Sequence, residues 1–136
     1  GFREGAATHP DVTATVYYHH GTPESLCALA DQLLAMKPRP TAWIVAVAPH
    51  FLTVMMHLQR RGIAIPREIS LISQDAEPWQ RFTVPEPTRY VADVPQLARV
   101  TAREVIKSMT RHPGPVKPQR ILPELNPGQT LGPAPH

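Results

Sequence analysis

The pattern of apolar and polar positions predicts that short strands alternate with helices along most of the chain. Apolar or β-branched runs at 12–18, 42–47, 69–73 and 88–92 are typical of buried strands. Between these runs, apolar residues recur at i, i+3, i+4 and i+7, which is the spacing of one buried helical stripe. Because strands and helices alternate, we expect an α/β fold with a parallel, doubly wound sheet joined by right-handed crossovers.

The clearest helix is predicted between Pro49 and Gly62. Its C-terminal end carries Arg60 and Arg61, which stabilise the negative end of a helix, and Gly62 is free to turn left-handed. Its buried stripe is predicted to consist of Phe51, Val54, Met55 and Leu58.

Three further helices are expected. Residues 1–8 have the pattern of the last turns of one helix. A second begins at Pro23, with Thr22 as its cap, and ends before Lys37. A third begins at Pro95, with an apolar stripe of Leu97, Ala98, Thr101, Ala102, Val105 and Met109.

The segments that connect and follow these elements are rich in proline. We expect a loop at 79–87, a linker at 112–118 and a short last strand at 119–122. Beyond Pro123 the chain is expected to be loosely ordered.

Composition limits the possible classes of protein. A chain of 136 residues with 42% apolar side chains is one domain or part of one. The single cysteine, Cys27, excludes an internal disulfide, and because it lies in a helical pattern we expect a small core residue rather than a nucleophile. The net charge of +3 is spread over the chain without a run of interleaved basic and aromatic residues, so no DNA-reading element is visible. No apolar run is long enough to span a bilayer, and no membrane partner is expected.

The stretch from 49 to 79 resembles the LacI/GalR family of bacterial transcription regulators. The family pattern is a helix ending in Arg-Gly, an apolar-Pro step, a strand, and then Gly-aromatic-Asp-Asp. Here the matching residues are Arg61-Gly62, Ile65-Pro66, Ile69 to Ile72 and Ser73-Gln74-Asp75-Ala76. Of the last four, only Asp75 keeps the family residue.

The resemblance implies part of a periplasmic-binding-protein-like (type I) effector domain. Residues 1–132 would be its C-terminal part, with 88–112 belonging to the other lobe and 133–136 forming a tail. The opening Gly1 to Gly5 resembles a family segment inside a helix, so we expect the chain to be a fragment of a longer protein.

The function implied is sensing rather than catalysis. A small-molecule effector, often a sugar in this family, would bind between the lobes and change how a separate helix-turn-helix, absent here, holds operator DNA. Such a regulator is cytoplasmic and needs no cofactor. Two alternatives are a secreted solute-binding protein for sugar transport and a small flavodoxin-like enzyme or signalling domain. No catalytic motif favours an enzyme.

Candidate ligand-binding residues follow the ends of the predicted strands. Asp75 lies just past a strand, at the edge where open α/β sheets bind ligands, and its carboxylate can accept hydrogen bonds from sugar hydroxyls. His20 follows the first strand, where the family places a residue that faces the effector. Val47 stands where the family often has an asparagine that binds the effector. Asp75 could instead be a surface or turn carboxylate, and His20 an ordinary loop histidine.

Two further candidates have structural alternatives. The Trp79 ring could form the floor of a sugar site or pack the loop against the core. Asp93 lies near a family pocket position and could equally cap the following helix. His50 and His57 are seven residues apart on one helix, too far to hold one metal ion, so no metal site is expected.

A homodimer is predicted through the 49–61 helix. Leu52 and Met56 form a second apolar column beside the buried stripe, and the resemblance places this helix at the family's dimer interface. The predicted contact residues are Leu52, Met55 and Met56. The alternative is a wider core beneath a neighbouring helix.

Overall fold

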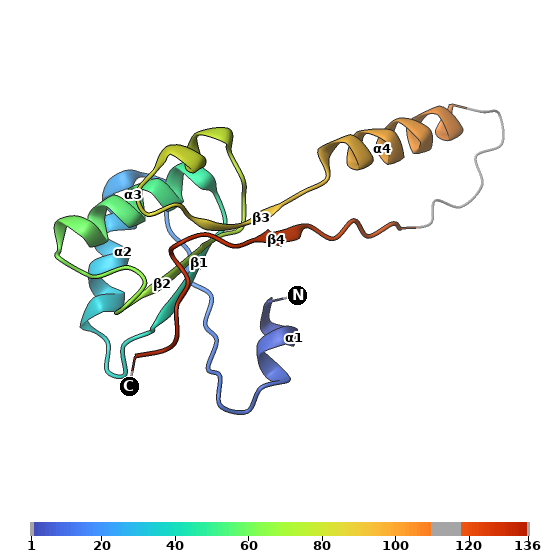
Figure 1. The fold of residues 1–136 in the computed structure, drawn as a ribbon. Coiled ribbons are helices and arrows are strands. Elements are labelled where there is room, and N and C mark those ends of the chain that lie inside the picture. The colour runs from blue at the N-terminus through green and yellow to red at the C-terminus, as the bar shows by residue number, and fades with distance from the viewer. Residues whose placement is uncertain (1, 110–117, 136) are drawn as a thin grey trace.

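A four-stranded sheet forms the centre of the chain in the computed structural model, which describes residues 2–109 and 118–135. Its strands are β1 (Ala42–Val45), β2 (Ser70–Ser73), β3 (Thr88–Val91) and β4 (Glu124–Asn126), side by side in that order. The first three strands are parallel, and β4 is antiparallel to β3. The predicted α/β class with a mainly parallel sheet is confirmed (Figure 1).

Helices α2 (Pro23–Ala35) and α3 (Ala48–Arg60) pack against each other beside this sheet. Thr22 begins α2 as predicted, because its side chain accepts a hydrogen bond from the Ser25 N–H at 3.2 Å. Gly62 follows α3 with φ at 74°, the left-handed conformation that the sequence predicted for it.

The hydrophobic core lies between these two helices and one face of the sheet. Phe51, Met55 and Leu58 of α3 are fully buried, and burial stabilises the fold by about 1.5–3 kcal/mol for each such side chain. From the sheet, Trp43 and Leu71 are paired in register and both belong to the core. Ile44 points to the opposite face and is 43% exposed.

Two helices lie apart from this core. In α1 (Phe2–Ala7) no residue is buried. The same is true of α4 (Val94–Ser108), which extends away from the sheet at the end of β3 (Figure 1). The apolar stripe predicted for α4 is therefore uncovered in the part of the chain that the structure describes.

Three predictions for secondary structure were wrong. Residues 12–18 belong to none of the strands, although their composition favours one; among the described residues no neighbouring strand pairs with them. The segment 79–87 contains a 3-10 helix, η1 (Pro78–Phe82), where a loop was predicted. The last strand is 124–126 and not 119–122, because residues 124–126 are the ones that pair with β3. The predicted linker at 112–118 lies almost wholly outside the described residues.

The prediction of loose order beyond Pro123 was also wrong. Thr130 is fully buried, and its hydroxyl donates to the Leu71 carbonyl at 2.6 Å and accepts from the Thr88 N–H at 2.9 Å. The Leu71 N–H in turn donates to the Thr130 carbonyl at 2.8 Å. The returning chain thus lies beside β2 just before the point where β3 begins to pair with it.

Candidate ligand-binding edge of the sheet

The carboxyl ends of β1 and β2 lie next to each other and carry two of the candidate residues. Val45 and Ser73, the last residues of the two strands, are paired in register, and the Gln74 N–H donates to the Val45 carbonyl at 2.9 Å. Val47 and Asp75 each follow two residues later. The parallel register therefore brings Val47 and Asp75 to one edge.

The loop before α2 reaches the same edge through His19. The ring of His19 meets the ring of His50 edge to face, with 4.8 Å between centroids, and His50 is in the first turn of α3. The Gly21 N–H donates to Nδ1 of His19 at 3.0 Å, so this nitrogen is unprotonated and the proton of a neutral ring is on Nε2. His20, the predicted residue, is the exposed neighbour of His19. Sequence reasoning missed the histidine that contacts α3.

Val47 and Asp75 differ in what they present at this edge. Val47 precedes α3 and is half-exposed, and its side chain cannot cap the helix. Asp75 is exposed, and its Oδ1 accepts a hydrogen bond from the Ala76 N–H at 3.0 Å. The edge therefore combines an apolar surface, imidazole groups and one carboxylate, which together can contact both the hydroxyls and the carbon skeleton of a polar ligand.

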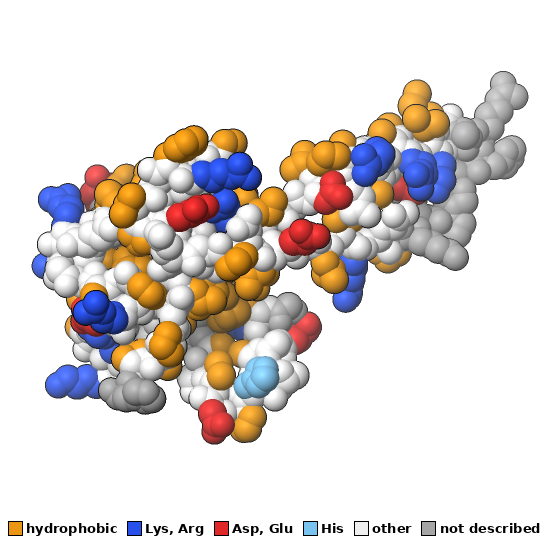
Figure 2. Space-filling view, viewed as in Figure 1, with side chains coloured by type: hydrophobic (Ala, Val, Ile, Leu, Met, Phe, Trp, Pro, Cys, Tyr) orange, Lys and Arg blue, Asp and Glu red, His pale blue; other side chains and the backbone are white. Residues whose placement is uncertain are grey.

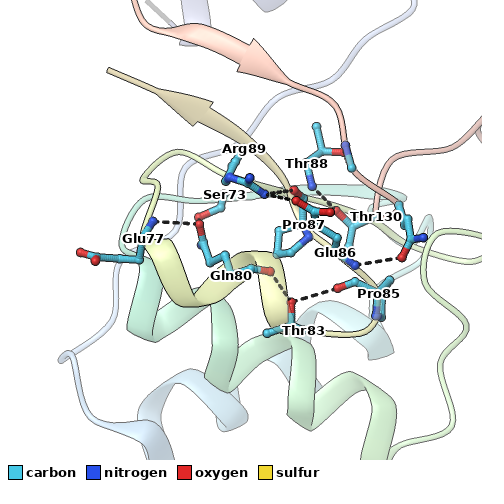
Figure 3. A network of polar contacts seen from close by, with 12 residues as sticks. Ser73, Glu77, Gln80, Thr83, Pro85, Glu86, Pro87, Thr88, Arg89 and Thr130 are labelled. Atoms are coloured by element: carbon cyan, nitrogen blue, oxygen red, sulfur yellow. Dashed lines mark hydrogen bonds and ion pairs between the residues drawn. The ribbon is translucent and has the colours of Figure 1, made fainter. Parts of the chain in front are cut away.

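A buried polar network supports the loop that carries Asp75 (Figure 3). Gln80 of η1 is fully buried, and its Nε2 donates to Oγ of Ser73 at 3.0 Å while its Oε1 accepts from the Glu77 N–H at 3.0 Å. Oγ of Ser73 donates to the Asp75 carbonyl at 2.6 Å. Sequence reasoning missed these residues, because a glutamine seven residues after the serine that ends a strand has no distinctive spacing.

The other two candidates lie in the segments that follow β2 and β3. Trp79 is in η1 and is partly buried. Asp93 follows β3 and caps α4, since its Oδ1 accepts from the Gln96 N–H at 2.8 Å. The carboxylate of Asp93 thus makes the helix-capping contact that was the alternative to a role in the pocket.

The candidate dimer residues on α3 separate into two groups. Met55 was predicted to be a dimer contact, but it is fully buried in the core, so its side chain is inaccessible to a partner. Met56 is 40% exposed and Leu52 is partly buried at the edge of the core. Leu52 and Met56 therefore remain as the surface column on this helix.

The surface elsewhere shows mixed charge. Basic and acidic side chains are interspersed with apolar ones on the face drawn in Figure 2. Within residues 2–109 and 118–135, no three His, Cys, Asp or Glu side chains are grouped so that they could hold a metal ion. The helices of this described part are all too short or too polar to cross a bilayer.

A hollow lies along α4, and its lining includes none of the candidate ligand-binding residues. It has a volume of about 450 Å³ and is open to solvent between α4 and residues 118–121. Its walls are mainly apolar and include Leu97, Val100, Val105 and Ile121.

Comparisons with solved structures give regulators of the LacI family. One from Bifidobacterium animalis has a TM-score of 0.76 at 22% identity, over 96% of this chain and 48% of that one. One from Lactobacillus casei, with bound sucrose, has a TM-score of 0.72 at 19% identity, over 96% of this chain and 49% of that one. One from Enterococcus faecium, with bound ribose, has a TM-score of 0.76 at 14% identity, over 99% and 50% of the two chains. The TM-scores show a shared fold, and at these low identities they show the fold alone. This chain spans about half the length of each neighbour.

Two sequence comparisons were informative in different ways. No curated protein sequence matches the chain. The family model described as "Periplasmic binding protein-like domain" matches residues 1–131, which is nearly the whole chain. The chain therefore belongs to the periplasmic binding protein-like domain family.

Proposed function

We propose that this chain is one half of the effector-binding domain of a LacI-type transcription regulator. The observation that supports this proposal most directly is the shared edge at which the loops after β1 and β2 meet the His19 loop. Two structural neighbours hold sucrose and ribose, so a sugar or a related polar metabolite is the proposed effector. Asp75 would accept hydrogen bonds from its hydroxyls, and Val47 would contact its apolar face.

In this proposal the ligand is bound and not transformed. Effector binding between two lobes would favour one of two lobe arrangements, and a separate helix-turn-helix would read that shift as a change in operator affinity. The regulator would be cytoplasmic and would form a homodimer through α3, with Leu52 and Met56 at the contact. This chain alone is expected to give no specific complex with operator DNA in a mobility-shift assay.

The alternative within the same family is a solute-binding protein for sugar transport. The family description covers periplasmic binding proteins. Val47 stands where LacI-type regulators often have asparagine, and a valine there suits a ligand with a larger apolar face. A ligand-dependent change in operator affinity of the longer protein would favour the regulator. Secretion of the longer protein and delivery of its ligand to a transporter would favour transport.

The ligand proposal is tested by calorimetric titration of the longer, two-lobed protein with sugars, beginning with sucrose and ribose. Loss of a charge-assisted hydrogen bond weakens binding by about 10- to 100-fold, which is the expected effect of Asp75→Ala. Asp11→Ala is the matched control, because Asp11 is an exposed carboxylate in the turn after α1. Equal affinities of the Asp75→Ala variant and the unmodified protein would remove Asp75 from the site.

A further inference from the structure

Gln80 holds two points of the loop that contains Asp75. Its side-chain amide has a donor end and an acceptor end, and the two ends bond different parts of the segment between β2 and η1. Oε1 accepts from the Glu77 N–H, so the amide nitrogen must face Oγ of Ser73. One fully buried side chain thereby fixes both the start of this loop at Ser73 and its end at Glu77.

The direction of the remaining hydrogen bond follows from this arrangement. Oγ of Ser73 already accepts from Gln80, and its single hydrogen is free to donate. The Asp75 carbonyl takes that hydrogen at 2.6 Å. The bonds therefore run in one order, from the Gln80 amide to the Ser73 hydroxyl to the Asp75 backbone, and each donor is used once.

We propose that Ser73 and Gln80 are positioning residues that fix the backbone of Asp75 at the ligand-binding edge. The proposal rests on the proposed function of Asp75, but the two residues themselves lie too deep to reach a ligand, since both are fully buried. Their hydrogen bonds hold the exposed carboxylate in one place before the ligand arrives. Such preorganisation reduces the entropy lost on binding.

The first test needs no ligand. Amide hydrogen exchange of this chain, followed by NMR, reports on the loop at Gln74 and Ala76 and on the core at β2 and α3. Loss of one buried hydrogen bond should raise exchange at Gln74 and Ala76 by about tenfold in Ser73→Ala, while the α3 amides keep their rates. Gln80→Leu should have the same effect by removing both of its bonds.

Thr83→Val is the matched control for these variants. The Thr83 hydroxyl lies 2.9 and 3.1 Å from the Gln80 and Pro85 carbonyls and can donate its single hydrogen to either, and neither acceptor belongs to the loop that contains Asp75. Exchange at Gln74 and Ala76 should stay at the unmodified rate in Thr83→Val. Should Ser73→Ala fail to fold, Gln80→Glu serves instead, because a carboxylate takes the Ser73 hydrogen away from Asp75 without a change of size. Unmodified exchange at Gln74 and Ala76 in the folded variants overturns the proposal.

The second test connects the loop to binding. With sucrose and ribose as probes of the two-lobed protein, Ser73→Ala should weaken binding by about tenfold when Asp75 is present and have no further effect beside Asp75→Ala. Equal weakening in both backgrounds would mean that Ser73 acts through general stability, which overturns the positioning role. A third outcome separates the two proposals. If Ser73→Ala raises amide exchange in the loop but Asp75→Ala leaves the sugar affinity unchanged, Ser73 does position the backbone of Asp75, and only the ligand-binding role of Asp75 is refuted.

Discussion

Gly128 marks a close approach between the returning C-terminal segment and the residues just before β3. A Cβ at this position would lie 2.4 Å from the carbonyl carbon and oxygen of Pro87. The Gly128 N–H donates to Oγ1 of Thr88 at 3.0 Å, and the Gln129 N–H donates to the Glu86 carbonyl at 2.6 Å. The contact is between backbone atoms on both sides, so no flexible side chain can move away to admit a methyl group.

Gly128→Ala is therefore expected to lower the free energy of unfolding by about 1–3 kcal/mol, the usual cost of overpacking. Chemical denaturation measures the change. Gly5→Ala is the control, because no atom lies within 4 Å of a Cβ there and α1 has no buried residue. An equal midpoint for Gly128→Ala and the unmodified chain would mean that the C-terminal segment does not pack against β3 in solution.

The candidate site could be predicted from the sequence only where chemistry follows directly from position in the chain. Asp75 and Val47 could be placed because each follows an apolar strand, and parallel strands end at one edge. The supporting residues could not be predicted in this way. Gln80 reaches Ser73 because it lies in a 3-10 helix, whereas the prolines of this segment predicted a loop. His20 was chosen over His19 for its place in a family pattern, whereas the contact with His50 depends on how the loop turns.

At the scale of elements, α2 and α3 are joined by a polar clamp as well as by the core. Asp31 of α2 bonds Nε2 of His57 through Oδ1 at 2.8 Å, and its Oδ2 pairs with the Arg61 guanidinium at the end of α3. The hydrogen bond from His57, followed by that from Arg61, lowers the pKa of the Asp31 carboxyl from its ordinary value of 3.8. The ionised form is thus favoured in the folded chain.

This lowered pKa predicts a dependence of stability on pH. Because the folded-state pKa is below the unfolded one, the contribution is present in full at pH values above the ordinary pKa and is lost as the pH falls through the lowered one. Asp31→Asn should melt at a lower temperature than the unmodified chain at pH 7, and the difference should shrink as the pH falls below the ordinary pKa of 3.8. Thermal unfolding followed by circular dichroism measures this, with Asp11→Asn as a control. A difference in melting temperature that stays constant below the ordinary pKa, over the whole acid range in which the chain is folded, would contradict the assignment.

The elements that the sequence predicted are those whose pattern is long enough to be read locally. α2 and α3 each repeat their apolar spacing over 13 residues, and their caps and stops agree with it. β4 is three residues long and two of them are polar, so its place depends on β3 and not on its own composition. Residues 12–18 have the opposite problem, since their β-branched composition is strong but a strand also needs a partner.

At the scale of the whole molecule, two helices of the described part of the chain carry exposed apolar side chains that could join two copies. One such surface is the Leu52 and Met56 column on α3, which we propose as the dimer contact. The other is the stripe on α4, where Val105 is 52% exposed and Met109 is 80% exposed. Either surface could hold two copies together, because exposed apolar area of this kind favours association. They lie on separate parts of the fold, so single substitutions can distinguish them.

Met56→Glu should therefore convert a dimer of this chain to a monomer without unfolding it. A carboxylate at position 56 would be buried without a partner in a symmetric contact, whereas in the monomer it faces solvent and lies one helical turn from Arg60. Val105→Glu on α4 is the matched control, because Val105 is also an exposed apolar residue of a helix and receives the same charge. Sedimentation velocity gives the mass, and circular dichroism shows that each variant is folded. A monomeric Val105→Glu beside a dimeric Met56→Glu would assign the contact to α4 and remove α3 from the proposed interface.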